Sequence, residues 1–248
     1  MGGNMGDYYD LGNYSRSIST TSPDAQIWFD RGLIWNYAYH HEEAVECFNK
    51  ALEYDPSCVM AHWGIAYAIG PNYNKQWGDF EDDEKENCLA AVHQAVASAR
   101  NHLHNATAIE KGLIKALAER YPDDVSIVDF GPWNDAFANA MRKVYQQHPD
   151  DMDIATIFAE SIMNRTPWKL WDLHTGKPAA GADTVEAIEV LETAFSKLAD
   201  QGSNRHPGLR PRVMIFVPPG PRYPKPACCL TIPAPISSRS PKRCSKEK

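Results

Sequence analysis

The chain has 248 residues, of which 43% are hydrophobic and 23% are charged. These values are typical of a globular protein and exclude wholesale disorder, and no apolar run reaches the roughly 20 residues that a transmembrane helix needs. Residues 210–248 carry nine Lys and Arg and one acid, whereas residues 1–209 carry 16 basic and 31 acidic side chains. Because nucleic-acid binding needs clustered Lys and Arg, this acidic body disfavours it.

The expected elements before residue 210 are all helical. Residues 1–24 are polar and form an N-terminal arm, which leads to a Ser-Pro-Asp helix start at residues 22–24. From Ala25 the apolar residues recur at helical spacing almost without interruption. Six later segments keep this spacing: 59–69, 85–100, 107–121, 134–147, 151–163 and 184–200. Since no alternating strand pattern of useful length appears, we expect an all-α fold.

The composition changes abruptly near Leu209. The following 39 residues hold nine of the 18 prolines and three of the six cysteines. One interpretation is out-of-frame or intron-derived sequence, and the other is a genuine basic, Pro-rich linker or ligand segment. We favour the first, because the apolar runs at 213–217 and 227–232 lack any partner pattern. The expected organisation is an arm (1–24), a helical repeat domain (25–209) and an irregular tail (210–248).

Helices this short cannot bury their apolar faces alone, which favours a repeat architecture. The first two predicted helices follow the pattern W-x2-L-G-x2-Y, A-x3-F and a closing Pro, which is that of the tetratricopeptide repeat (TPR). The matching residues are Trp28, Gly32, Trp35, Ala44, Phe48, Ala51 and Pro56. Small residues at Gly32 and Ala44 let the paired helices cross closely, and Phe48 fills the space between them. Arg31 departs from the pattern, because Leu is usual there.

The similarity extends beyond one repeat. A second repeat begins at residues 60–67 and breaks at 70–74, and the pairs at 85–121 and 134–163 look like degenerate repeats. Together with the segment TPWKLWDLHTGKP, these features resemble a family of TPR-containing proteins in bacteria and fungi, over residues 8–209. Such proteins continue past His206-Pro207-Gly208-Leu209 with more helices. The resemblance therefore implies an α-α superhelix and a C-terminally truncated member.

In TPR arrays the first helix of each pair lines a concave groove that binds peptides. The spacing predicts nine residues in this groove or at its rim: Phe29, Leu33, Asn36, Tyr37, Trp63, Tyr67, Asn72, Tyr73 and Asn74. Aromatic and amide side chains suit a partly apolar segment whose backbone they can hydrogen-bond. The alternative is that several of them, Trp63 above all, fill the core. Some TPR proteins bind the carboxylate tail of a partner with Lys and Asn on this face. Such a partner is disfavoured, because Phe29 and Leu33 stand at those positions here.

A second hypothesis is that some of the histidines are metal ligands. The candidates are His40, His41, His62, His174 and His206. A zinc site needs three or more converging ligands, whereas adjacent histidines in a turn seldom point at one ion. His62 fits equally well as a buried side chain between repeats. The cysteines form no CxxC pair, and no phosphate-binding loop, nucleophile elbow or HExxH motif is present.

From these patterns we expect a non-enzymatic interaction module or scaffold that binds a protein or peptide segment in its groove. We expect no cofactor, no nucleic-acid or membrane partner, and a cytoplasmic location. Two alternatives remain open. One is a metal-assisted accessory enzyme of a specialised biosynthetic pathway, and the other is an inert truncated product. The sequence does not fix the oligomeric state.

Overall fold

The computed structural model describes residues 8–121, 123, 126–200 and 206–209. This part of the chain is mostly helical, as predicted, with one two-stranded sheet. The α-helices are α1 (Pro23–Tyr37), α2 (His41–Tyr54), α3 (Val59–Ile69), α4 (Asp82–Asn101), α5 (Ala108–Ala118), α6 (Gly131–Gln147), α7 (Met152–Met163) and α8 (Thr184–Asp200). Short 3-10 turns lie at Trp77–Asp79 and Leu103–Asn105. The predicted tail at 210–248, and with it the truncation hypothesis, lies outside the described residues.

Local capping explains where several helices begin. Ser22 caps α1 by accepting a hydrogen bond from the Ala25 amide at 3.2 Å, and Pro23 stands in the first turn, where its missing N–H costs nothing. Thr107 and Glu110 form a reciprocal capping box at the start of α5. The Asp151 carboxylate accepts from the Asp153 amide at 3.0 Å and so caps α7. These starts follow from the sequence alone.

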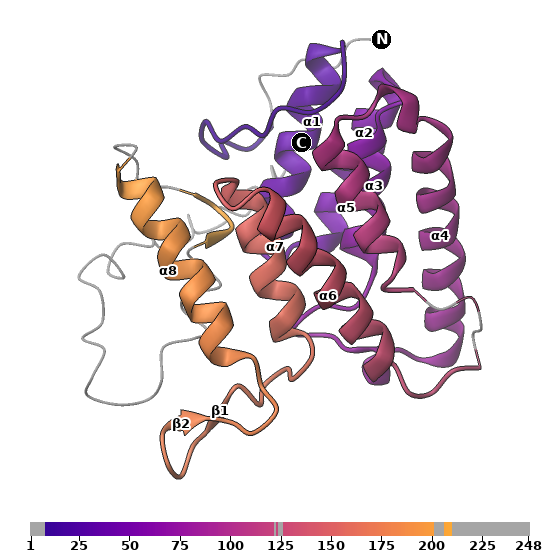
Figure 1. Cartoon of the computed structure of the whole chain (residues 1–248). Coiled ribbons are helices and arrows are strands. Elements are labelled where there is room, and N and C mark those ends of the chain that lie inside the picture. The colour runs from indigo at the N-terminus through magenta and orange to yellow at the C-terminus, as the bar shows by residue number, and fades with distance from the viewer. Residues whose placement is uncertain (1–7, 122, 124–125, 201–205, 210–248) are drawn as a thin grey trace, which may run out of the picture.

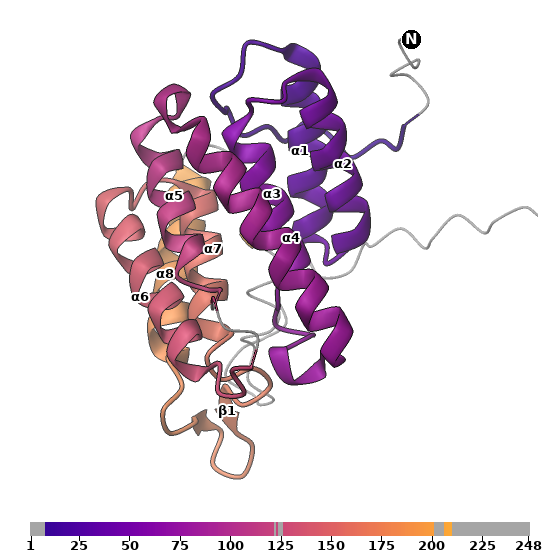
Figure 2. The ribbon, with the colours of Figure 1, turned by 90° about the vertical axis from the view of Figure 1, so that its right-hand side faces the viewer.

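Consecutive helices pack as hairpins. α1 lies against α2, α3 against α4, α5 against α6, and α7 against α8, and each hairpin contacts the next along the chain (Figure 1). Figure 2 shows this progression, from α1 and α2 at one side of the molecule to α6 and α8 at the other. The arrangement is an all-α fold of helical hairpins. No helix in the described ranges is both long and apolar enough to cross a membrane.

The first two hairpins pack around Phe48, as the spacing predicted. A Cβ added at Gly32 would lie 2.6 Å from Phe48 Cε1, and one added at Gly64 would lie 2.7 Å from the same atom. The ring therefore lies between two backbones that carry no side chain at the contact. Any larger residue at Gly32 or Gly64 would push α1 or α3 away from α2.

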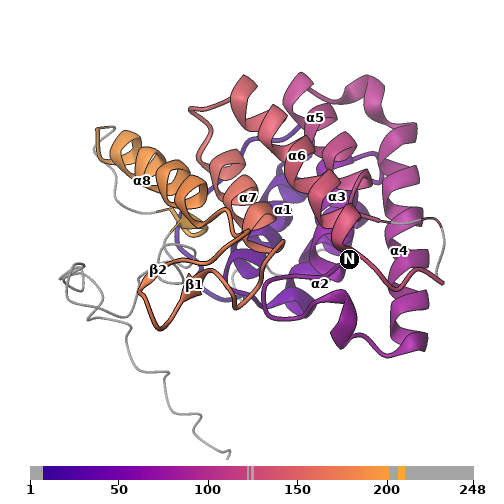
Figure 3. The same ribbon diagram turned by 60° about the horizontal axis from the view of Figure 1, so that its bottom comes forward.

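α7 is the most deeply buried helix of the described chain. Every residue from Asp153 to Met163 is buried, because α7 packs between α6 and α8 and also reaches α1 and α3. Outside the helices, β1 (Trp171–Asp172) and β2 (Lys177–Pro178) form an antiparallel pair, with Trp171 opposite Pro178. This hairpin extends away from the helices (Figure 3).

Candidate functional site

Most residues predicted to line the groove are buried within the chain itself. Seven of the nine are at most 5% exposed: Phe29, Leu33, Asn36, Tyr37, Trp63, Tyr67 and Tyr73. Two of them, Tyr37 and Tyr67, contact α7, whereas Phe29 packs on Phe48 of α2. Tyr37 of α1 donates a hydrogen bond to Asp153 at 2.5 Å, and Tyr67 of α3 donates one to Glu160 at 2.7 Å. These seven side chains are therefore buried within the described part of the chain, as in the alternative that they fill the core.

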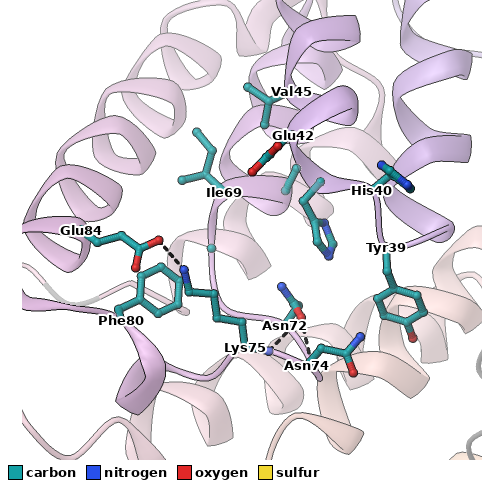
Figure 4. A pocket seen from close by; sticks show the side chains of 13 residues that line it. Tyr39, His40, Glu42, Val45, Ile69, Asn72, Asn74, Lys75, Phe80 and Glu84 are labelled. Atoms are coloured by element: carbon teal, nitrogen blue, oxygen red, sulfur yellow. Dashed lines mark hydrogen bonds and ion pairs between the residues drawn. The ribbon is translucent and has the colours of Figure 1, made fainter. Parts of the chain in front are cut away.

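The other two predicted residues, Asn72 and Asn74, line a surface cavity of about 440 Å³ (Figure 4). The cavity lies where the turn between α1 and α2 approaches the end of α3 and the start of α4. Its lining also includes Tyr39, His40, His41, Glu42, Val45, Ala68, Ile69, Gly70, Lys75, Phe80 and Glu84. Apolar and polar side chains are therefore combined in a space the size of typical ligand sites.

The Asn72 side chain fixes one wall of this cavity. Its carbonyl oxygen accepts hydrogen bonds from the amides of Asn74 at 2.9 Å and Lys75 at 3.1 Å, and the Asn72 amide donates to the Lys75 carbonyl at 2.8 Å. The Lys75 ammonium pairs with Glu84 and lies 4.4 Å from the centre of the Phe80 ring. The exposed Asn74 amide side chain is consequently held at the rim by a rigid turn.

The opposite wall comes from the turn between α1 and α2. Tyr39 adopts a left-handed backbone conformation with φ of 62°, which is uncommon for a residue with a side chain. The Nδ1 atom of His41 lies 3.1 Å from Asn36 Oδ1, so the buried end of α1 orients this imidazole. Val45 and Ile69 pack against the core and form an apolar surface between the two polar walls.

A second polar site is buried and centres on Asp153. Its carboxylate accepts hydrogen bonds from the hydroxyls of Tyr14 and Tyr37. Arg16 donates to Asp153 and to Asp151, each at 2.8 Å. His206 Nε2 lies 3.2 Å from Asp153 Oδ1. These residues come from the arm, α1, the start of α7 and the segment 206–209, so we call them the Asp153 cluster.

The electrostatics of the Asp153 cluster fix its protonation states. Burial raises the pKa of the Asp153 carboxyl, but the contact with His206 and the charge of Arg16 outweigh it and hold this pKa well below its usual range. Burial and the Asp153 charge raise the pKa of the Tyr14 and Tyr37 hydroxyls far above the usual value. The ionised carboxylate thus accepts from both hydroxyls and from Arg16, and these contacts join the arm to α1 and α7.

The metal-ligand candidates lie in separate places. His40 and His41 line the cavity, His62 lies beside His102 with ring centroids 6.4 Å apart, and His174 is exposed in the β1–β2 turn. His206 belongs to the Asp153 cluster. In the part of the chain that the structure describes, no group of three or more His, Cys, Asp or Glu side chains is placed to hold a metal ion.

Three cysteines of the described chain are buried free thiols. Cys47, Cys58 and Cys88 are free, and burial raises the pKa of each to about 11. A thiol with such a pKa carries little nucleophilic thiolate at neutral pH. Tyr8 of the arm further covers Cys47, since its hydroxyl lies 3.1 Å from the sulfur.

No family model, no curated protein and no solved structure matches this chain. The functional argument therefore depends on the geometry of the cavity and of the Asp153 cluster.

Sequence reasoning missed Tyr14, Arg16 and Asp153, which the structure places at the centre of the Asp153 cluster. Asp153 follows the helix cap Asp151 by two residues, and acidic residues in a first turn are common because they interact favourably with the helix dipole. One available signal was the concentration of tyrosines in an otherwise polar arm. Nothing local could have shown that the arm pairs with a helix about 140 residues further on.

Proposed function

We propose that this protein is a TPR-like interaction module without catalytic chemistry of its own, and that it binds a polypeptide segment at the cavity between the α1–α2 turn and the α3–α4 loop. The observation that supports the proposal is the composition of the cavity, which joins an apolar surface to the hydrogen-bonded Asn72 side chain and the exposed Asn74 side chain. Binding hot spots of this kind place one buried side chain at the centre and polar contacts around it.

The cavity also indicates the chemistry of its partner. Val45, Ile69 and Phe80 offer an apolar surface for one large side chain. Asn74 can donate to and accept from an extended backbone, as amide side chains do. Glu42 is exposed at the rim, whereas the only lysine of the lining already pairs with Glu84. We therefore propose an extended segment with an apolar anchor next to a basic residue.

The proposal can be tested by selecting peptides from a displayed random library against the full chain. We expect the enriched peptides to share an apolar residue beside Lys or Arg. Their dissociation constants should rise about tenfold, or 1.4 kcal/mol, in the variant Glu42→Lys and severalfold in Asn74→Ala. Glu46→Lys is the matched control, because Glu46 is exposed on the same helix outside the cavity. No enrichment, or equal loss in Glu42→Lys and Glu46→Lys, would contradict the proposal.

A further inference from the structure

The segment His206–Leu209 contacts Tyr14, Tyr37, Asp153 and Thr156 in the way that a bound peptide contacts a receptor. We propose that Tyr14, Tyr37, Asp153 and Thr156 form a peptide-binding site specific for a His-x-Gly-Leu sequence, and that the chain occupies this site with its own residues 206–209. A partner segment with the same sequence would then compete with the chain's own segment. This site is separate from the cavity between the α1–α2 turn and the α3–α4 loop.

The histidine shapes the segment from within and packs against two tyrosine rings of the receptor side. Nδ1 accepts from the amides of Gly208 at 3.2 Å and Leu209 at 3.3 Å. Nε2 faces the receptor side and lies 3.2 Å from Asp153 Oδ1. The rings of Tyr14 and Tyr37 pack against the imidazole, with centroid distances of 5.3 and 5.8 Å. Nδ1 therefore holds the turn of the segment, whereas the ring itself contacts Tyr14, Tyr37 and Asp153.

Gly208 is required because there is no room for a side chain, and not because of its backbone conformation. A Cβ added at Gly208 would lie 2.7 Å from Thr156 Cγ2 and 2.9 Å from Tyr37 Cε1. Both atoms belong to fully buried residues that have little room to move. Leu209, the next residue, has no exposed surface and joins the hydrophobic core. The site therefore excludes any side chain at one position and takes up an apolar one at the next.

The receptor side of this site is held together without the segment. Arg16 pairs with Asp151 and Asp153, and both tyrosine hydroxyls donate to Asp153. The arm is also fixed independently, since the Gln26 amide donates to the Arg16 carbonyl at 2.8 Å. A surface that is preorganised in this way loses little entropy when a peptide binds.

The chain's own segment should mask the site, because a tethered ligand competes at an effective concentration in the millimolar range. The test is fluorescence anisotropy with a labelled peptide that spans residues 204–211, added to the full-length chain and to its Gly208→Ala variant. The clash with Thr156 and Tyr37 displaces the tethered segment in the variant. We expect the peptide to bind Gly208→Ala at least tenfold more tightly than the unmodified chain.

Three controls make the result decisive. The same peptide with Ala in place of Gly should bind neither protein, and Glu42→Lys added to Gly208→Ala should leave the affinity unchanged, which separates this site from the proposed function. His206→Ala, which removes contacts without creating a clash, replaces Gly208→Ala if that variant lacks a cooperative melt. Equal affinity of the Gly and Ala peptides, or no binding to a variant that melts cooperatively, would overturn the proposal.

Discussion

Polar side chains are buried on one side of the α1 C-terminus and line an open cavity on the other. Tyr37 points toward α7 and shares the buried Asp153 carboxylate with Arg16. Two residues later, Tyr39 lines an open cavity beside the exposed side chain of Asn74. In the Asp153 cluster the polar groups are desolvated and bind one another, which fixes the structure. At the cavity rim the exposed side chains of Glu42 and Asn74 keep hydrogen-bonding capacity toward solvent, which is what a partner needs.

The largest effect that this comparison predicts is that of Asp153→Ala. The substitution removes the acceptor of two phenol hydroxyls and leaves the buried Arg16 with Asp151 alone. We expect the free energy of unfolding, measured in urea, to fall by about 3–5 kcal/mol. Asp150→Ala is the matched control, because that side chain is 82% exposed and pairs only with Lys197. A difference below about 1 kcal/mol between the two variants would show that the cluster is not a structural anchor.

Removal of a single side-chain group should destabilise the protein more at Tyr37 than at the cavity rim. Tyr37→Phe removes one buried hydrogen bond to a carboxylate and is expected to cost about 1.5–3 kcal/mol. Asn74→Ala on the open side should stay within about 0.5 kcal/mol, because its side chain is exposed. Thermal and urea unfolding of both variants give these values. Similar losses in the two variants would remove the distinction between the regions.

The pH dependence of stability should distinguish the same two regions. The pKa of Asp153 is lower in the folded chain than in the unfolded one. The stabilisation that its ionised carboxylate gives is therefore complete above the unfolded pKa of about 3.9 and is lost as the pH falls below that value. Between about pH 7 and pH 3 the unmodified chain should lose about 1 kcal/mol more than Asp153→Asn. Other carboxyls are common to both proteins and cancel. Parallel pH curves would contradict the assignment.

The smallest effect is expected at the cavity rim. Lys75 and Glu84 form an ion pair, but their side chains are 40% and 45% exposed. Glu84→Gln should therefore change the free energy of unfolding by less than about 1 kcal/mol, and added salt should reduce even this difference. Unfolding curves at low and high salt measure it. A loss comparable to that of Tyr37→Phe would mean that the rim is as structural as the Asp153 cluster.

The sequence did not predict this cavity. Asn72 and Asn74 were expected at the rim of a different groove, and His40 and His41 were considered as metal ligands, but all four line this space. Phe80 was not considered, because it belongs to an acidic loop with no helical pattern. A cavity wall is made by elements that meet in space, and a linear pattern does not show such a meeting.

The sequence by itself determined the helices and the closest contacts between neighbouring ones. Apolar spacing, the caps at Ser22 and Thr107, and the glycine at residue 32 act within a few residues or within one hairpin. Only the tertiary structure decided which faces stay open. Tyr37, expected in a groove, is covered by α7, the arm and His206, all remote from it along the chain. Burial depends on such long-range packing, and the same apolar residue pattern suits a groove and a core equally well.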